Sequence, residues 1–229
     1  MGTPLDDREA QVEAVLDRLE EAYPDATISL DFENRLELLV AVVLSAQCTD
    51  ERVNQVTAEL FEKYTTPEDY ARVDVEELAE DIGSITYFNQ KAGWIQEACG
   101  RIVSEHDGEV PDTMEALTDL PGVGRKTANV VLQHGHDVVE GVVVDTHAMR
   151  LSRRLGITER SSRDAIERDL MEVVPKERWQ QYTHLLIAHG RAVCTARNPD
   201  CSACVVEERC PSSKLDGGVD LASGEPWDA

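Results

Sequence analysis

The sequence has few lysines and no long apolar run. Only 5 of its 22 basic residues are Lys, against 45 Asp and Glu, and the formal net charge is −23 over 229 residues. No apolar stretch approaches the roughly 20 residues that a membrane-spanning helix needs. The N-terminal MGTPLDD also lacks the basic and apolar pattern of a signal peptide. We therefore expect a folded cytoplasmic protein with no membrane partner.

The acidic excess is unevenly distributed along the chain. Residues 1–37 carry 11 acidic and 3 basic side chains, whereas residues 121–163 carry 4 acidic and 7 basic ones. A repulsive coat would keep the surface away from polyanions. Adaptation to high salt is the other interpretation, because the Debye length falls to about 3 Å at 1 M. The positive segment favours a salt-adapted, halophilic protein that binds a polyanion.

Helical patterns cover almost the whole chain. No repeat of fixed period is present, and the strand-like run 142–144 has no partner strand. Apolar spacing and capping residues predict an all-α protein. The expected helices cover residues 6–22, 33–46, 50–63, a short segment from 67, 75–82, 89–105, 112–119, 125–134, 145–155, 162–173 and 176–191. Residues 212–229 lack an apolar pattern, so we expect a mobile tail.

The stretch LPGVGRKTANVVL, residues 120–132, contains a glycine turn before a helix. A phosphate-binding loop of the nucleotide-hydrolase type needs Gly directly before Lys, but Arg125 separates Gly124 from Lys126. What remains is either an ordinary turn or a helix-hairpin-helix. In the second interpretation, which the basic segment favours, amides around Gly122, Gly124 and Arg125 bind a DNA phosphate without regard to sequence.

Lys126 and Asp145 are the candidate catalytic residues. An ammonium two residues into a helix, next to Arg125, is poorly placed for the helix dipole, which favours the free amine. A free amine forms Schiff bases with sugar aldehydes, although the position alone favours a plain phosphate-contacting lysine. Asp145 is either the N-cap of the next helix or a carboxylate that takes a proton from an amine. His147 is expected either to pack locally or to support a neighbouring site residue.

Four cysteines form a C-x6-C-x2-C-x5-C array: Cys194, Cys201, Cys204 and Cys210. Intracellular proteins seldom use disulfides, so the array predicts a metal site. Four thiolates suit either zinc or a [4Fe–4S] cluster, and the spacing alone does not decide between them. Cys48 and Cys99 are expected to be buried thiols on helices.

Together with VDTHAMR and AHGRAVC, the glycine turn and the cysteine array resemble the endonuclease III family of DNA glycosylases with abasic-site lyase activity, from about residue 8 to 211. The resemblance implies a [4Fe–4S] cluster on the four cysteines, Lys126 as Schiff-base nucleophile and Asp145 as its activating carboxylate. It also implies that Gln47 fills the gap left by a flipped base. The implied substrate is double-stranded DNA containing oxidised pyrimidines or abasic sites, bound by a monomer.

The implied fold has two helical lobes with the DNA cleft between them. A six-helix lobe covers 28–138, and residues 1–27 with 139–211 form the cluster lobe. One departure from the family pattern is Tyr87, which stands where an aliphatic wedge residue is common. Arg150, Arg153 and Arg154 are further expected DNA contacts. The alternatives are a mismatch-specific glycosylase of the same superfamily and a non-enzymatic, metal-stapled DNA-binding module.

Overall fold

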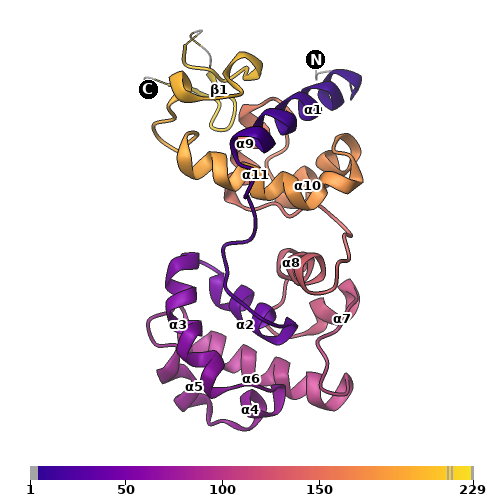
Figure 1. Cartoon of the computed structure of the whole chain (residues 1–229), viewed down its shortest axis with the longest axis vertical. Helices are drawn as coiled ribbons and strands as arrows, with labels where there is room; N and C mark the ends of the chain where they lie inside the picture. Colours follow the sequence, from indigo (N-terminus) through magenta and orange to yellow (C-terminus); the bar gives the residue numbers. More distant parts are fainter. Residues whose placement is uncertain (1–4, 216, 218, 228–229) are drawn as a thin grey trace. The chain divides into compact units, whose positions relative to one another are not determined.

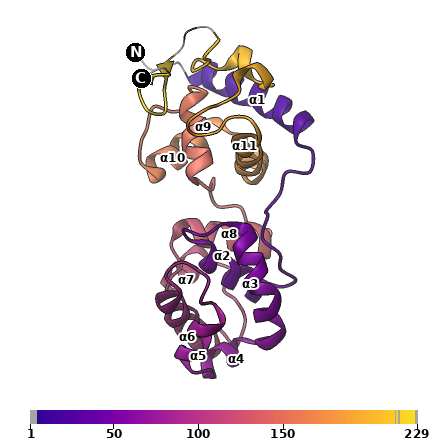
Figure 2. The same ribbon diagram turned by 90° about the vertical axis from the view of Figure 1, so that its left-hand side faces the viewer.

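The computed structural model describes residues 5–215, 217 and 219–227. The chain divides into two compact units. One contains Ser29–Glu140, and the other combines Met1–Ile28 with Gly141–Ala229. Figures 1 and 2 show the helices of each unit. Among the described residues, no helix is both long and apolar enough to cross a bilayer.

The unit of residues 29–140 is built around α2 (Arg35–Ser45). This helix has buried residues at every position from Leu38 to Leu44, as expected for a helix enclosed on all sides. It packs against three helices of its unit, α3 (Asp50–Lys63), α6 (Phe88–Glu105) and α8 (Arg125–Gly135). The side chain of Asn34 caps α2 by accepting a hydrogen bond from the amide of Glu37 at 3.0 Å.

Seven helices, not six, lie in this unit, all of whose residues are described. The remaining three are α4 (Pro67–Arg72), α5 (Val75–Asp81) and α7 (Met114–Asp119). The six-helix expectation is therefore wrong by one. The seven helical patterns expected from the sequence over this range are all present, including the one at 75–82, where Asp74 accepts a hydrogen bond from the amide of Glu76 and starts α5 directly after α4 ends.

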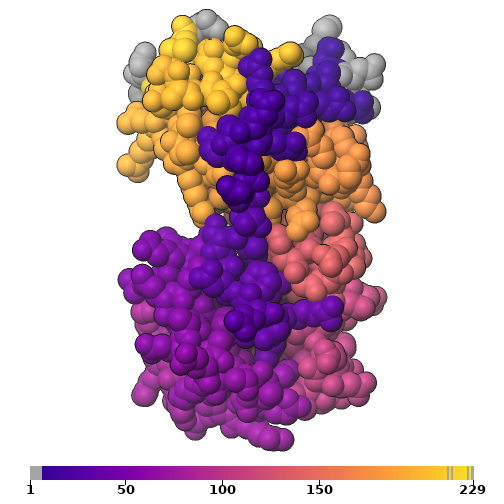
Figure 3. Space-filling model, viewed as in Figure 1, coloured from indigo at the N-terminus to yellow at the C-terminus, as the bar shows by residue number. Residues whose placement is uncertain are grey.

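The other unit joins α1 (Leu5–Ala22) to the second half of the chain. Helix α1 packs against α10 (Arg163–Val173) and α11 (Trp179–Ala192), and α11 also packs against α9 (Thr146–Arg154). Figure 3 shows the indigo N-terminal residues lying over the orange and yellow C-terminal ones of the same unit. The described residues of this unit also contain three short 3₁₀ turns, η1 (Lys176–Arg178), η2 (Cys201–Ala203) and η3 (Glu207–Arg209).

The C-terminal segment forms structure that the sequence did not predict. Strand β1 (Val219–Asp220) pairs antiparallel with β2 (Glu225–Pro226). Ser212 and Ser213 are buried, and the indole of Trp227 donates a hydrogen bond to the carbonyl of Ser212 at 2.8 Å. These contacts are polar, so they leave no apolar periodicity in the sequence from which they could be predicted. The part of the expected mobile tail at 216, 218, 228 and 229 lies outside the described residues.

Candidate functional site

The glycine turn is a helix-hairpin-helix formed by α7, residues 120–124 and α8. Leu120 and Val123 are buried, and the amide of Val123 donates to the carbonyl of Leu120 at 3.1 Å. Gly122 has φ +76°, and a Cβ placed there would lie 3.0 Å from the Cβ of Trp94. Only glycine suits both the left-handed backbone and this close approach. The hairpin is therefore held against α6.

Helix α8 begins without a side-chain cap and without an acidic residue to offset its dipole. Gly124 is its N-cap residue, so no side chain caps the helix, and its first turn contains no acidic residue. A helix N-terminus of this kind attracts anions through its amides and dipole. Arg125 and Lys126 are both exposed here. The structure thus brings the hairpin glycines, Arg125 and Lys126 together in one surface region.

Asp145 is the N-cap residue of α9. Its Oδ1 accepts a hydrogen bond from the amide of Ala148 at 2.7 Å. The preceding apolar run 142–144 is buried and is not a strand. The hydroxyl of Thr183 in α11 donates to the carbonyl of Val143 at 2.8 Å, which fixes the entry to α9. Asp145 belongs to the unit containing α9, and Lys126 belongs to the unit of residues 29–140.

The basic residues of α9 face the interior more than the sequence suggested. Arg150 is half-buried and donates hydrogen bonds to the carbonyl of Cys194 at 2.9 Å and to that of Gly190 at 3.4 Å. Arg153 is also half-buried. Arg154 is only 2% exposed. Its expected contact with DNA is therefore wrong, because its guanidinium is enclosed by residues of its own unit.

His147 of α9 packs against Gly190 of α11, which is one of the roles expected for it. A Cβ at Gly190 would lie 2.5 Å from Nδ1 of His147, so the glycine allows α9 and α11 to approach each other. The same ring nitrogen lies 3.3 Å from Nη2 of Arg150. His147 thus helps to hold two helices of this unit.

Gln47 and Tyr87 share a left-handed backbone, with φ of 56° and 60°. Both side chains are exposed, and Tyr87 is 58% exposed. Such φ values are uncommon outside glycine and are frequent at functional sites. A buried residue that sequence analysis missed links the two positions. Lys91, in the first turn of α6 after Tyr87, donates hydrogen bonds to the carbonyls of Leu44 at 2.8 Å and Ala46 at 2.6 Å.

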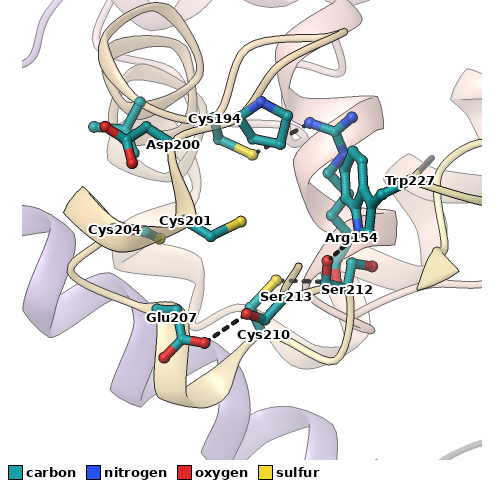
Figure 4. Close-up of a pocket in the computed structure, with 12 residues that line it drawn as sticks. Arg154, Cys194, Asp200, Cys201, Cys204, Glu207, Cys210, Ser212, Ser213 and Trp227 are labelled. Atoms are coloured by element: carbon teal, nitrogen blue, oxygen red, sulfur yellow. Dashed lines mark hydrogen bonds between the residues drawn. The ribbon is translucent and has the colours of Figure 1, made fainter. Parts of the chain in front are cut away.

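The four cysteines of the array line one pocket, together with Arg154 and Trp227. In Figure 4, the thiols approach the pocket from separate parts of the loop that follows α11. The two remaining cysteines lie in the other unit, and both are distant from the array in sequence. Cys99 is a buried thiol on α6, as expected, and burial raises its pKa to about 12. Cys48 is half-buried and follows the end of α2, so its expected place on a helix is wrong.

Hydrogen-bond donors surround the thiols. Nη1 of Arg154 donates to Sγ of Cys194 at 3.4 Å. Nε2 of His189 lies 3.4 Å from Sγ of Cys204, and Nδ1 of His189 lies 3.0 Å from the hydroxyl of Tyr23. Burial lowers the pKa of His189 to about 4, so its ring is neutral. If Tyr23 donates to Nδ1, Nε2–H is left to donate to the sulfur.

This donor set fits an iron–sulfur cluster. Burial raises the metal-free pKa of Cys204 to about 11 and of Cys210 to about 12, and a coordinated metal ion offsets that cost by stabilising the thiolate. Among the described residues, no three His, Cys, Asp or Glu side chains converge on the position of one metal ion. The thiols are instead arranged around a cavity, and four cysteine thiolates are the ligands of a [4Fe–4S] cluster.

Known proteins share both the helix-hairpin-helix and the cysteine loop. The family model described as "HhH-GPD superfamily base excision DNA repair protein" matches residues 40–176. The model described as "Iron-sulfur binding domain of endonuclease III" matches residues 194–210. Endonuclease III of Synechocystis is 52% identical over 196 residues, which cover 86% of this chain and 90% of the relative. The chain belongs to the endonuclease III family.

Other members of the endonuclease III family agree with this assignment. The Escherichia coli K12 protein is 41% identical over 196 residues, covering 86% of this chain and 92% of the relative. A solved endonuclease III, in a complex described as a trapped covalent intermediate with DNA, has a TM-score of 0.86 at 44% identity. That match covers 91% of this chain and 98% of the solved one.

Membership in the endonuclease III family establishes the activity of the chain. It is a base excision repair enzyme, a DNA glycosylase with abasic-site lyase activity. Its cofactor is a [4Fe–4S] cluster.

Proposed function

We propose that this enzyme removes oxidised pyrimidines from double-stranded DNA and cleaves the strand 3′ to the resulting abasic site through a Schiff base on Lys126. The observation that carries this proposal is the exposed Lys126 in the uncapped first turn of α8, directly after the hairpin. Hairpin and α8 amides bind a backbone phosphate, and the amine then stands beside the sugar of the same strand. The enzyme acts as a monomer.

Lys126 carries the covalent chemistry. Its free amine attacks C1′ of the damaged nucleotide, and the bond from C1′ to the base breaks with the electron pair leaving on the base. Loss of a proton from Nζ and opening of the C1′–O4′ bond then give an iminium. Removal of a proton from C2′ expels the 3′ phosphate by β-elimination, and water hydrolyses the imine to free the lysine.

Asp145 has two roles in this proposal. Through Oδ1 it caps α9, as its bond to the amide of Ala148 indicates. Its carboxylate also accepts a proton from the amine or stabilises positive charge that develops on the sugar. The two roles are separable, because asparagine and serine also cap helices but carry no charge.

Gln47 and Tyr87 contact the distorted duplex. A target base leaves the stack when it enters a glycosylase, and unstacking costs a few kcal/mol. Two exposed side chains on left-handed turns are suited to occupying the space left behind and to probing the opposite strand. Arg150 and Arg153, both half-buried, contact the DNA backbone in this proposal and do not read bases.

Lys126→Gln tests the nucleophile. Borohydride reduces a Schiff base to a stable amine, so the wild-type protein should form a covalent adduct with a duplex containing an abasic site. The adduct should disappear in Lys126→Gln while duplex binding largely persists. Lys176→Gln is the matched control, because Lys176 is an exposed lysine of the other unit. An adduct at wild-type yield with Lys126→Gln would refute the assignment.

The same assay with a substrate panel tests the lesion class. Excision of oxidised pyrimidines is expected, and excision confined to mismatched bases would favour the mismatch-specific alternative.

Asp145→Asn tests the carboxylate apart from the cap. We expect turnover to fall by about 100-fold or more, the usual contribution of a positioned acid or base, with the melting temperature nearly unchanged. Asp145→Ala should lower both turnover and stability, because the cap contributes about 1 kcal/mol. Wild-type turnover with Asp145→Asn would show that Asp145 serves only as a helix cap.

A further inference from the structure

The chain folds back over its own cluster site after the last cysteine. The iron–sulfur binding match ends at residue 210, and residues 212–227 follow it. Ser212, Ser213 and Trp227 line the same pocket as the four cysteines (Figure 4). Ser212 and Ser213 are 1% and 2% exposed, so this part of the segment is packed as tightly as the interior.

Arg154 joins the segment to the cysteine loop. Its Nε and Nη2 donate to the two carboxylate oxygens of Asp220, each at 2.9 Å. Its Nη1 donates to Sγ of Cys194 and to the carbonyl of Thr195 at 2.7 Å. Nη2 donates also to the carbonyl of Ala196 at 2.8 Å. These five contacts use all five N–H groups of a guanidinium.

The Arg154–Asp220 pair is buried at both ends. The side chains are 2% and 10% exposed. A buried, bidentate pair depends on both partners, since removing one leaves the other as an uncompensated charge in a medium of low dielectric constant. Asp220 therefore neutralises a positive charge that is in direct contact with Cys194.

Trp227 covers the guanidinium from outside. The centre of its ring lies 4.7 Å from Cζ of Arg154, within the range of a cation–π contact. Its Nε1 donates to the carbonyl of Ser212, and Oγ of Ser212 accepts a hydrogen bond from the amide of Leu221 at 3.0 Å. The β1–β2 pairing between Asp220 and Glu225 joins the strand before Leu221 to the strand before Trp227.

We propose that the described residues of this segment, 212–215, 217 and 219–227, form a cap that closes over the iron–sulfur site through Asp220 and Trp227, and so controls both access to the cluster and its reduction potential. Access depends on the cap because Trp227, Ser212 and Ser213 form part of the pocket wall. The potential depends on it because nearby charge, hydrogen bonds to sulfur and solvent exposure set the potentials of iron–sulfur clusters. Asp220 acts on Cys194 through Arg154 and is a positioning residue.

The first test measures access. Purified holoprotein is mixed with a chelator and a mild oxidant, and the loss of visible absorbance of the cluster is followed over time. Trp227→Ala and a chain ending at Ser213 should bleach at least about tenfold faster than wild type, because a loss of about 1.4 kcal/mol in closure raises the open population tenfold. Leu221→Ala is the matched control, because Leu221 is an exposed cap residue whose side chain is 42% exposed.

The second test measures the potential. Asp220→Asn keeps the size of the side chain and removes its charge, so Arg154 is no longer neutralised. The net charge beside Cys194 becomes more positive, which favours the reduced cluster. The midpoint potential in a spectroelectrochemical titration should therefore shift to a more positive value. Leu221→Ala should leave it unchanged.

Wild-type bleaching rates in Trp227→Ala and the shortened chain, at wild-type iron content, would overturn control of access. A potential unchanged in Asp220→Asn would overturn control of potential. If Asp220→Asn holds no cluster, the bleaching rate of Trp227→Ala still decides control of access and its midpoint potential decides control of potential, because this variant leaves the ion pair intact and opens the pocket wall to solvent. Neither measurement involves DNA or Lys126, so its failure is separate from a failure of the proposed nucleophile.

Discussion

Lys91 carries a structural role that its residue type conceals. It is 1% exposed, and burial lowers its pKa. Its ammonium binds the carbonyls of Leu44 and Ala46 at the end of α2, where the helix dipole favours a cation. Gln47 follows directly, and Tyr87 lies four residues before Lys91. One buried lysine thus holds the two left-handed positions proposed to contact DNA.

Lys91→Met tests this role. Methionine fills a similar volume but leaves two carbonyls without their donor, and an unsatisfied buried polar group costs about 1–3 kcal/mol. We expect the free energy of unfolding, measured by urea denaturation, to fall by about that amount. Affinity for an abasic duplex should also fall, because the backbone before Gln47 is no longer held.

Lys176→Met provides the comparison for Lys91→Met, since Lys176 is exposed. It should change neither quantity. Equal stability of the two variants would show that the Lys91 contacts contribute nothing.

At the scale of elements, the hairpin combines two glycines with different requirements. Gly122 has a left-handed backbone and contacts Trp94. Gly124 has φ −89° and ψ 173°, and a Cβ there would meet nothing within 4 Å. Folding therefore requires glycine at 122, whereas the fold itself leaves room for a side chain at 124.

Gly122→Ala and Gly124→Ala separate folding from binding. Gly122→Ala should destabilise the protein by about 1–2 kcal/mol or more, because a left-handed backbone with a Cβ is strained and Trp94 must move. Gly124→Ala should leave the melting temperature unchanged and weaken duplex binding, since a methyl group then stands between the amides and a phosphate. Thermal unfolding and fluorescence anisotropy measure the two effects. Unchanged binding with Gly124→Ala would contradict a close phosphate approach there.

At the scale of the whole molecule, the net charge of −23 dominates the long-range field. Arg154 is buried and Arg150 is committed to backbone carbonyls, so fewer basic side chains of residues 121–163 reach solvent than the sequence indicates. The exposed ones are Arg125, Lys126, Arg160 and Arg163. Contacts of an acidic molecule with DNA therefore depend on short-range amide and guanidinium interactions.

Folding and lyase activity should persist at molar salt and decline at low ionic strength. Screening shortens the repulsion between the acidic surface and the duplex, whereas an ordinary DNA-binding protein loses affinity with salt because each phosphate contact releases counterions. The measurement is cleavage of an abasic duplex, with circular dichroism, from tens of millimolar to several molar KCl. A steady loss of activity with rising salt, in a protein folded throughout, would refute salt adaptation.

The sequence by itself determined the features that depend on neighbours in the chain. Helix positions, the cap at Asp145, the hairpin and the cysteine array follow from local spacing and backbone preferences, and the structure contains them all. Helix α5, expected over residues 75–82, also has a local signal in the cap at Asp74.

Tertiary structure alone decided which distant residues meet. Arg154 belonged to a basic segment by sequence, yet its partners are Cys194 and Asp220, which lie 40 and 66 residues away. Lys91 reaches carbonyls 45 and 47 residues away. Polar contacts over such separations leave no periodicity, because each depends on one side chain meeting one partner and not on a repeated pattern. Whether a charged residue faces solvent or is buried against a partner is therefore decided only when the chain has folded.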